Sequence, residues 1–427
     1  MRVLDTKSSQ NSSQNPIQKK IFIVQNKEDI KNKYKQIISL RFCERFCGNF
    51  ASKTRTQKLK TQKLKNSIMN NPSHSRQVTT PPLWGRLGGG LLFFSFFILA
   101  SCVDSEYSSV DTPQNNFEVL WKLMDEHYCF FDYKKETIGV DWYEVRARYS
   151  KKINPEMSKT QLFEVMCQMV GELRDGHVNI GATFDLARNW SYFEDYPRNF
   201  NTELVEDYLG NSNEYSIAGG LKYRILDDNV AYVRCASFDN TIGDGNLSLM
   251  LDALRHCHGM IIDIRNNGGG LLTDAEDLAE RFTNEPTLVG YMYHKTGKGH
   301  NDFSSPEPVY IYPDPSIRWQ KPVVVLTNRK VFSAANDFVK AMREFPLVTI
   351  MGDTTGGGSG MPFTLEMPNG WSVRYSAVVT LDADKNHIEF GIEPDIVCSL
   401  DSAQLLLHRD SMIETARKFI LDKANAQ

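Results

Sequence analysis

The spacing of apolar residues differs between two parts of the chain. In the first part, apolar side chains recur every three or four positions in the stretches NFEVLWKLMDEHYCFF, DWYEVRARYSKKI and SKTQLFEVMCQMVGEL. This period predicts amphipathic helices, and Ser158 followed by Lys-Thr-Gln forms a capping-box sequence before the third helix. Residues 116–183 are therefore expected to form a small N-terminal helical domain.

From about residue 216, short apolar runs alternate with helical periodicity. The run Val323–Leu326 leads through a loop into AANDFVKAMREF, which has a helical pattern. Hairpin turns are predicted at Asp227–Asn229 and at Asn369-Gly370. Strands that alternate with helices indicate a mainly parallel sheet covered by helices, so residues 216–427 are predicted to form an α/β domain.

A short apolar segment precedes the helical part. GRLGGGLLFFSFFILASC contains a basic residue, Arg86, an apolar core from Leu91 to Leu99, and small residues before Cys102. The core is too short to span a bilayer comfortably and has the layout of a secretory signal. Its end, Leu-Ala-Ser-Cys, resembles a bacterial lipobox, in which Cys102 is lipidated and becomes the new N-terminus. A buried core helix is the alternative, and the three glycines before the run disfavour it.

The position of this signal raises a question about the residues before it. Residues 1–68 are basic, polar and partly repetitive, and they show no core-forming pattern. Either translation begins at Met69 and residues 1–68 are a start-site artefact, or they form a disordered basic leader. In both cases residues 1–101 lie outside the predicted fold, and the polar residues 102–115 form a tether.

The signal and tether predict a location in the cell. They are typical of a cell-envelope lipoprotein of a Gram-negative bacterium, on the periplasmic side of the outer membrane or at the cell surface. Asp104 and Glu106 after the lipidated cysteine resemble surface-export signals of some such lipoproteins. The membrane is thus an expected partner through the lipid anchor.

Composition excludes some classes of function. The 427 residues carry a formal charge of −3, which gives no reason to expect nucleic acid as a partner. An aromatic content of 11% argues against global disorder. The cysteines after the lipobox have no CxxC spacing and are odd in number, so one disulfide is possible but its pairing is not predictable. They are Cys129, Cys167, Cys235, Cys257 and Cys398.

Two strand-to-helix junctions carry candidate chemistry. Asn267 is followed by Gly268, Gly269 and Gly270, which leave backbone N–H groups open to negative charge. Neither GxxxxGK[ST] nor GxGxxG is present, so this loop is either half of an oxyanion hole or an ordinary flexible loop. Ser333 precedes the predicted helix 334–345. It is either a helix cap or a nucleophile served by the helix dipole and by the amide of Ala334.

A serine nucleophile needs a base. Lys330 lies before the turn, and Lys340 lies about 10 Å along the helix axis, so neither is convincing. His177 follows an Asp-Gly turn and is the best imidazole, although a histidine after a turn can also be a simple surface residue. His256 and His258 have no third ligand nearby, so no metal site is predicted.

Five motifs in order resemble the S41 family of serine peptidases. They are LRDGHVNI, GMIIDIRNNGGG, TNRKVFSAANDF, MGDTTGGGSGMP and IEFGIEPDIV, and they span roughly residues 116–400. The family includes the tail-specific or C-terminal processing peptidases and the tricorn core protease. The resemblance implies a ClpP/crotonase-like α/β core with an N-terminal helical domain. It also implies hydrolysis of protein or peptide substrates without a metal or organic cofactor.

The resemblance also assigns roles to individual residues. The nucleophile falls on Ser333, and the oxyanion amides fall on Ala334 and on the glycine loop at Gly269 and Gly270. The C-terminal processing branch uses a Lys about 25 residues after the Ser, and that position here is Gly358. The chain therefore departs from that branch.

The tricorn-like branch offers a different base. It uses a His from a DGH-type motif, which matches His177, and a late Glu that orients the assembly. Glu389 is the candidate for this Glu, and Glu393 is the fallback. The expected reaction is acyl transfer to Ser333 with His177 as the general base.

Substrate selection and two alternative functions stay open. The family commonly carries a PDZ domain, but the connector 184–215 is too short for one. The insertion 291–320, rich in Tyr and Pro, is either a groove for an extended peptide or a surface loop. The two alternative functions are a non-catalytic lipoprotein that binds peptides or apolar ligands, and a Ser–Lys peptidase with a Lys from elsewhere.

Overall fold

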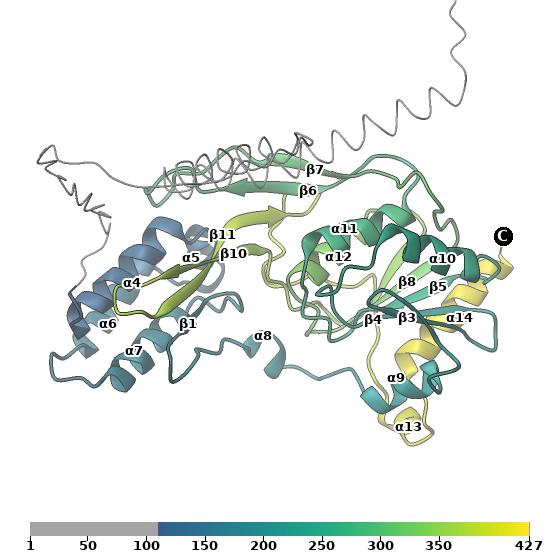
Figure 1. Cartoon of the computed structure of the whole chain (residues 1–427), viewed down its shortest axis with the longest axis horizontal. Coiled ribbons are helices and arrows are strands. Elements are labelled where there is room, and N and C mark those ends of the chain that lie inside the picture. Colours follow the sequence, from purple (N-terminus) through teal and green to yellow (C-terminus); the bar gives the residue numbers. More distant parts are fainter. Residues whose placement is uncertain (1–109, 427) are drawn as a thin grey trace, which may run out of the picture. The chain divides into compact units, whose positions relative to one another are not determined.

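A computed structural model describes residues 110–426 of the chain. The predicted signal, Cys102 and the first part of the tether lie outside the described residues. Within residues 110–426, no helix combines the length and the apolar character needed to cross a membrane. The described residues form two sheets and the helices that cover them (Figure 1).

The larger sheet has seven strands in the order β12-β9-β8-β5-β4-β3-β2. β4, β5, β8, β9 and β12 run parallel, while β2 and β3 are antiparallel additions at one edge. The predicted mainly parallel sheet is therefore confirmed, as is the hairpin between β3 and β4. The strands are β2 (Ser216–Ala218), β3 (Leu221–Ile225), β4 (Ala231–Cys235), β5 (Met260–Asp263), β8 (Val323–Thr327), β9 (Val348–Gly352) and β12 (Ile396–Val397).

Helices cover both faces of this sheet. Val323 and Val325 of β8 face a core shared with α10, α11 and α12, while Val324 and Leu326 face a core shared with α9 and α14. Because both faces are buried, the strand is continuously apolar instead of alternating. The helices are α9 (Thr202–Leu209), α10 (Asp244–Leu254), α11 (Leu272–Ala279), α12 (Ala334–Met342) and α14 (Ser411–Asn425), with the short α8 (Ser191–Glu194), η3 (Glu280–Phe282) and α13 (Ser402–Leu405).

The N-terminal helices are α4 (Pro113–His127), α5 (Phe131–Ile138), α6 (Trp142–Tyr149) and α7 (Lys159–Gly171), with η2 (Ser150–Lys152). The predicted capping box before α7 is present, since Ser158 and Gln161 exchange hydrogen bonds. One difference from the prediction is that α4 ends at His127 and α5 starts separately. The amide of Cys129 donates to the carbonyl of Ser376, so a tertiary hydrogen bond replaces a helical one at this break.

The smaller sheet is antiparallel and has five strands, in the order β1-β11-β6-β7 with β10 paired to β11. The predicted hairpin at Asn369-Gly370 joins β10 and β11, and the insertion 291–320 contributes the end of β6 and all of β7. β11 shares its apolar core with α4 and α7. The strands are β1 (Asn179–Gly181), β6 (Thr287–His294), β7 (Glu307–Ile311), β10 (Gly360–Glu366) and β11 (Ser372–Leu381).

Candidate active site

Ser333 lies between the end of β8 and the start of α12. It occupies the N-cap position, yet its side chain makes no capping hydrogen bond. Its backbone has φ 58° and ψ −127°, a conformation that costs roughly 1–3 kcal/mol for a residue with a side chain. Its amide donates to the carbonyl of Gly357 at 2.9 Å, which holds this geometry. The hydroxyl is therefore left available for another partner.

That partner is the imidazole of His177. Its Nε2 lies 3.0 Å from Oγ of Ser333, within hydrogen-bonding distance, although the two residues are 156 positions apart. The amide of His177 donates to Oδ1 of Asp175 at 2.7 Å, which fixes the turn before β1. The side chain is buried rather than exposed, so His177 is no surface residue. Its Nδ1 has no hydrogen-bond partner within residues 110–426.

Burial controls the charge of this imidazole. Loss of solvent lowers the pKa of His177 to about 4; the carboxylate of Asp175 opposes this shift, and Arg374 adds to it. His177 is therefore neutral at pH 7, and a neutral Nε2 is able to take a proton from the Ser333 hydroxyl.

The glycine loop approaches Ser333 from β5. A Cβ on Gly269 would lie 2.8 Å from Cβ of Ser333 and 3.0 Å from the amide nitrogen of Ala334, so only glycine permits this contact. The amide of Gly269 itself is engaged by Oδ1 of Asn267 at 2.9 Å. Among the described residues, the amides of Gly270 and Ala334 have no hydrogen-bond acceptor. Of the three predicted donors, these two remain available to an oxyanion.

Gly358, where the C-terminal processing branch would place a lysine, has no room for a side chain. Its φ is 76°, and a Cβ there would lie 2.4 Å from the ring of Phe332. That ring stacks on Tyr192 with centroids 4.3 Å apart and lies 4.7 Å from the ring of His177. An aromatic ring that supports the histidine therefore occupies the space into which a lysine would extend.

Glu389 is buried close to the histidine but not against it. Its Oε1 accepts from Nζ of Lys134 at 3.0 Å, and its Oε2 accepts from the amide of Ser359 at 2.9 Å. No hydrogen bond joins Glu389 to His177 in the part of the chain that the structure describes. Glu393, the fallback candidate, is exposed. The structure thus favours Glu389 over Glu393 as a member of the site.

The ion pair of Glu389 is fully desolvated. The side chains of Lys134 and Glu389 are 0% and 2% exposed. Burial raises the pKa of Glu389 to about 7, the negative charge of Asp175 adds to this rise, and Lys134 opposes it. The negative charge of Asp175 thus raises the pKa of both Glu389 and His177, so it interacts electrostatically with both groups.

Residues beyond the predicted set complete this environment. Oδ2 of Asp175 accepts from the hydroxyls of Tyr128 at 3.1 Å and Ser376 at 2.8 Å. Asp175 belongs to the DGH motif, so the sequence already indicated that it lies near His177. Tyr128 and Lys134 had none, because each sits in a stretch that otherwise resembles an ordinary amphipathic helix.

The other sequence candidates lie away from this chemistry. Nζ of Lys330 sits over the ring of Phe193, and Nζ of Lys340 pairs with Asp337 at 2.9 Å. His256 and His258 are exposed. Over residues 110–426 there is no group of three or more residues suited to hold a metal ion.

Models of two protein families match the chain. The model of peptidase family S41 matches residues 229–398, and that of the tricorn protease C1 domain matches residues 109–171. The carboxy-terminal processing protease CtpA of Bacillus subtilis is 27% identical over 188 residues, which are 43% of this chain and 38% of CtpA. The matched region thus spans well under half the length of that relative.

Solved structures extend the likeness over the described part of the chain. A candidate peptidase from Parabacteroides merdae is 46% identical with a TM-score of 0.71, and the match covers 74% of this chain and 99% of that protein. Mature CPAF, solved in complex with lactacystin, is 12% identical with a TM-score of 0.58 and shows similarity of fold alone. The expected α/β class with a ClpP-like core is confirmed.

The burial of His177 predicts a dependence of stability on pH. Its pKa of about 4 lies below the usual 6.5, so between these values the unfolded chain binds a proton that the folded chain does not. Stability from this residue is present above about pH 6.5 and is lost as the pH falls towards 4, by up to about 3 kcal/mol. Urea unfolding at pH 7 and pH 4.5 measures the loss.

The matched comparison uses His177→Gln and the exposed His256→Gln. The first variant should lose less stability than the wild type between the two pH values, and the second should lose as much as the wild type. An equal loss in all three proteins would contradict the assignment.

Proposed function

Because this chain belongs to peptidase family S41, we propose that it is a serine peptidase that hydrolyses peptide bonds in protein or peptide substrates. The observation that carries the proposal is the 3.0 Å contact between Nε2 of His177 and Oγ of Ser333. It is supported by the backbone of Ser333, which has a positive φ and leaves the hydroxyl free of a capping bond.

Acylation starts at Ser333. His177 Nε2 takes the hydroxyl proton while Oγ attacks the carbonyl carbon of the scissile bond. The resulting oxyanion accepts hydrogen bonds from the amides of Ala334 and Gly270, and each such donor is typically worth about 3 kcal/mol of barrier. His177 then donates its proton to the leaving amine, and the C–N bond breaks. Water deprotonated by His177 attacks the ester, which releases the new carboxyl terminus and returns the proton to Ser333.

Two buried carboxylates support the charged intermediate. His177 becomes an imidazolium in a site that strongly disfavours its charge, so nearby negative charge is needed to stabilise it. Asp175 supplies part of this charge, and Glu389 supplies the rest when it is ionised. Lys134 favours the ionised form of Glu389 and positions it through the 3.0 Å ion pair.

The same geometry bears on the two alternatives. A Ser–Lys mechanism needs a lysine at Ser333, but within the described residues Ser333 has no hydrogen bond to a lysine, and Lys134 and Lys340 are engaged in ion pairs. A non-catalytic binding protein would have no need of a strained serine held against a neutral histidine. Catalysis is therefore the function that this site supports best.

The proposal extends to the location of the enzyme. Cys102 is lipidated after signal cleavage, and residues 102–112 tether the peptidase to a membrane of the cell envelope; the predicted tether to residue 115 is too long, because α4 begins at Pro113. The support comes from the signal-like sequence that ends in Leu-Ala-Ser-Cys. The proposed location is the outer membrane. The enzyme acts either on its periplasmic side or at the cell surface.

Substitution of either member of the dyad should abolish turnover. We expect Ser333→Ala and His177→Ala to lower kcat/KM on fluorescently labelled casein by at least about 10³-fold, because the nucleophile and its base act as a unit. A fluorophosphonate probe should label the wild type and not Ser333→Ala. The exposed Ser399→Ala is the matched control and should keep both signals. A wild type that takes up no probe and does not cleave casein would favour the binding protein, and a Ser333→Ala variant with full activity would show that Ser333 is not the nucleophile.

The ion pair between Lys134 and Glu389 should set the acid limb of the pH–rate profile. Because the ionised form of Glu389 is required, kcat/KM falls as the pH drops through its pKa of about 7. In Lys134→Met the pKa of Glu389 rises further, so the limb should move upward by about one unit or more. Glu389→Gln should lack this limb, and Lys159→Met, which breaks an exposed ion pair, should leave it in place. An unmoved limb in a folded Lys134→Met would remove Lys134 from the mechanism.

Lipidation of Cys102 is testable by metabolic labelling. Cells that express the chain and grow on an alkyne-labelled fatty acid should yield labelled protein in the membrane fraction. Cys102→Ala should lose the label and leave that fraction, while the buried Cys129→Ala should behave as the wild type. Unlabelled wild-type protein would contradict the anchor.

A further inference from the structure

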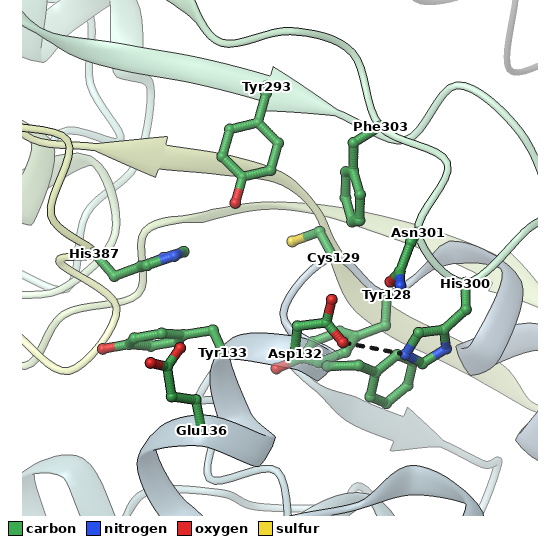
Figure 2. Close-up of a pocket in the computed structure, with 11 residues that line it drawn as sticks. Tyr128, Cys129, Asp132, Tyr133, Glu136, Tyr293, His300, Asn301, Phe303 and His387 are labelled. Carbon is green, nitrogen blue, oxygen red and sulfur yellow. Dashed lines mark ion pairs between the residues drawn. The ribbon is translucent and has the colours of Figure 1, made fainter.

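A cavity of about 200 Å³ lies beside the site and takes no part in the mechanism above. Figure 2 shows Tyr293 and Phe303 entering it from one side, Asp132 and Tyr133 of α5 from the other, and His387 at one end. Neither Ser333 nor His177 lines it. The cavity is therefore distinct from the reacting groups.

Aromatic rings form its walls. Tyr293 and Phe303 meet edge to face with centroids 5.5 Å apart, and Tyr133 stacks on His387 at 4.0 Å. The face of an aromatic ring carries partial negative charge and attracts cations at distances up to about 6 Å. The walls thus favour a ligand that is both partly apolar and positively charged.

The charges around the cavity favour the same kind of ligand. Asp132 and Glu136 lie one turn apart on α5 and both line the cavity, while no lysine or arginine does. Burial lowers the pKa of His387, and the charge of Lys134 lowers it further, while the charge of Glu136 raises it. The net effect is a lowered pKa, so this ring adds no positive charge near neutral pH. His300, at the other end, lies 2.8 Å from Asp125 through Nδ1 and 3.8 Å from Asp132 through Nε2, the contact dashed in Figure 2.

Two buried lysines lie outside the cavity lining. Lys134 is buried against Glu389. Nζ of Lys295 donates to the carbonyls of Gly299 and His300 at 2.6 and 2.7 Å and lies 5.1 Å from the ring centroid of Phe303, so the faces left for a ligand cation are those of Tyr293 and Tyr133. Both side chains are almost fully buried. The cavity therefore combines two carboxylates with aromatic rings and has no lysine or arginine among its lining residues.

We propose that this cavity binds one cationic group, a primary ammonium or a guanidinium on a short aliphatic stem. Its volume is below the ~300 Å³ typical of the smallest drug-sized sites, so it suits a single side chain or a small amine. Two sources supply this chemistry, namely a basic side chain of the peptide substrate and a free amine. The first source rests on the proposed peptidase function, and the second does not.

The cavity is also connected to the catalytic residues. Tyr128 lines it, and the hydroxyl of the same side chain donates to Asp175, whose other oxygen holds the turn of His177. His387 precedes Glu389 by two positions. A bound cation thus lies one side chain, that of Tyr128, away from Asp175.

The experiment measures binding in the Ser333→Ala variant, so that its outcome does not depend on catalysis. Ligand-observed NMR titrations compare n-butylammonium and n-butylguanidinium with the neutral 1-butanol. In the Ser333→Ala background, Asp132→Asn combined with Glu136→Gln should weaken binding of both cations by roughly five- to tenfold. Glu206→Gln, which removes one exposed charge on α9, is the matched control and should leave binding unchanged.

The results separate the outcomes clearly. Equal binding of 1-butanol, or unchanged cation binding after loss of both carboxylates, would overturn the proposal. If a lysine-containing peptide displaces n-butylammonium and its norleucine counterpart does not, the cavity is a substrate subsite. If n-butylammonium binds and neither peptide displaces it, the cavity is a site for free amines. Cation binding in a protein that fails to hydrolyse casein would leave the cavity assigned and refute only the peptidase.

Discussion

The backbone around Ser333 is the constraint on which the site depends. The serine adopts a positive φ because two other segments approach it closely, the glycine loop after β5 and the segment around Gly357. These contacts cost conformational freedom, and the packed sheet compensates by holding both segments at the same edge. The side chain of Ser333 and the amide of Ala334 consequently lie against Gly269 before any substrate arrives, which is the kind of preorganisation that acyl transfer requires.

Burial then determines which groups are able to do acid–base chemistry. The enclosed imidazole of His177 stays neutral and ready to accept a proton, while Glu389 is brought close to its ionisation point near neutrality. Phe332 takes part in this arrangement, since its ring supports His177 and at the same time fills the space beside Gly358. The same Phe332 ring therefore supports the histidine base and excludes a lysine side chain at position 358.

Much of the fold and part of the site were predictable from local patterns. The buried strands, the capping box at Ser158 and both hairpins follow from periodicity and turn chemistry, and motif order pointed to Ser333 and His177. The smaller sheet was not predicted, because it pairs strands as remote as β1 and β11. Lys134 and Tyr128 were also missed, since a single polar residue in an amphipathic helix does not indicate which distant carboxylate it meets. Their roles depend on tertiary contacts that local spacing does not encode.

The ion pair between Lys134 and Glu389 has a consequence for the timing of biosynthesis. The two residues are 255 positions apart, so the pair forms only when nearly the entire chain is present. Long-range contacts of this kind close late, after the entropy of the intervening loop has been overcome. A chain still emerging from the ribosome contains Ser333 before residue 389 has been made, and so before this ion pair is able to form. The complete environment of Glu389 therefore depends on folding of the described domain as a whole, and no N-terminal portion of the chain that ends before Glu389 contains it.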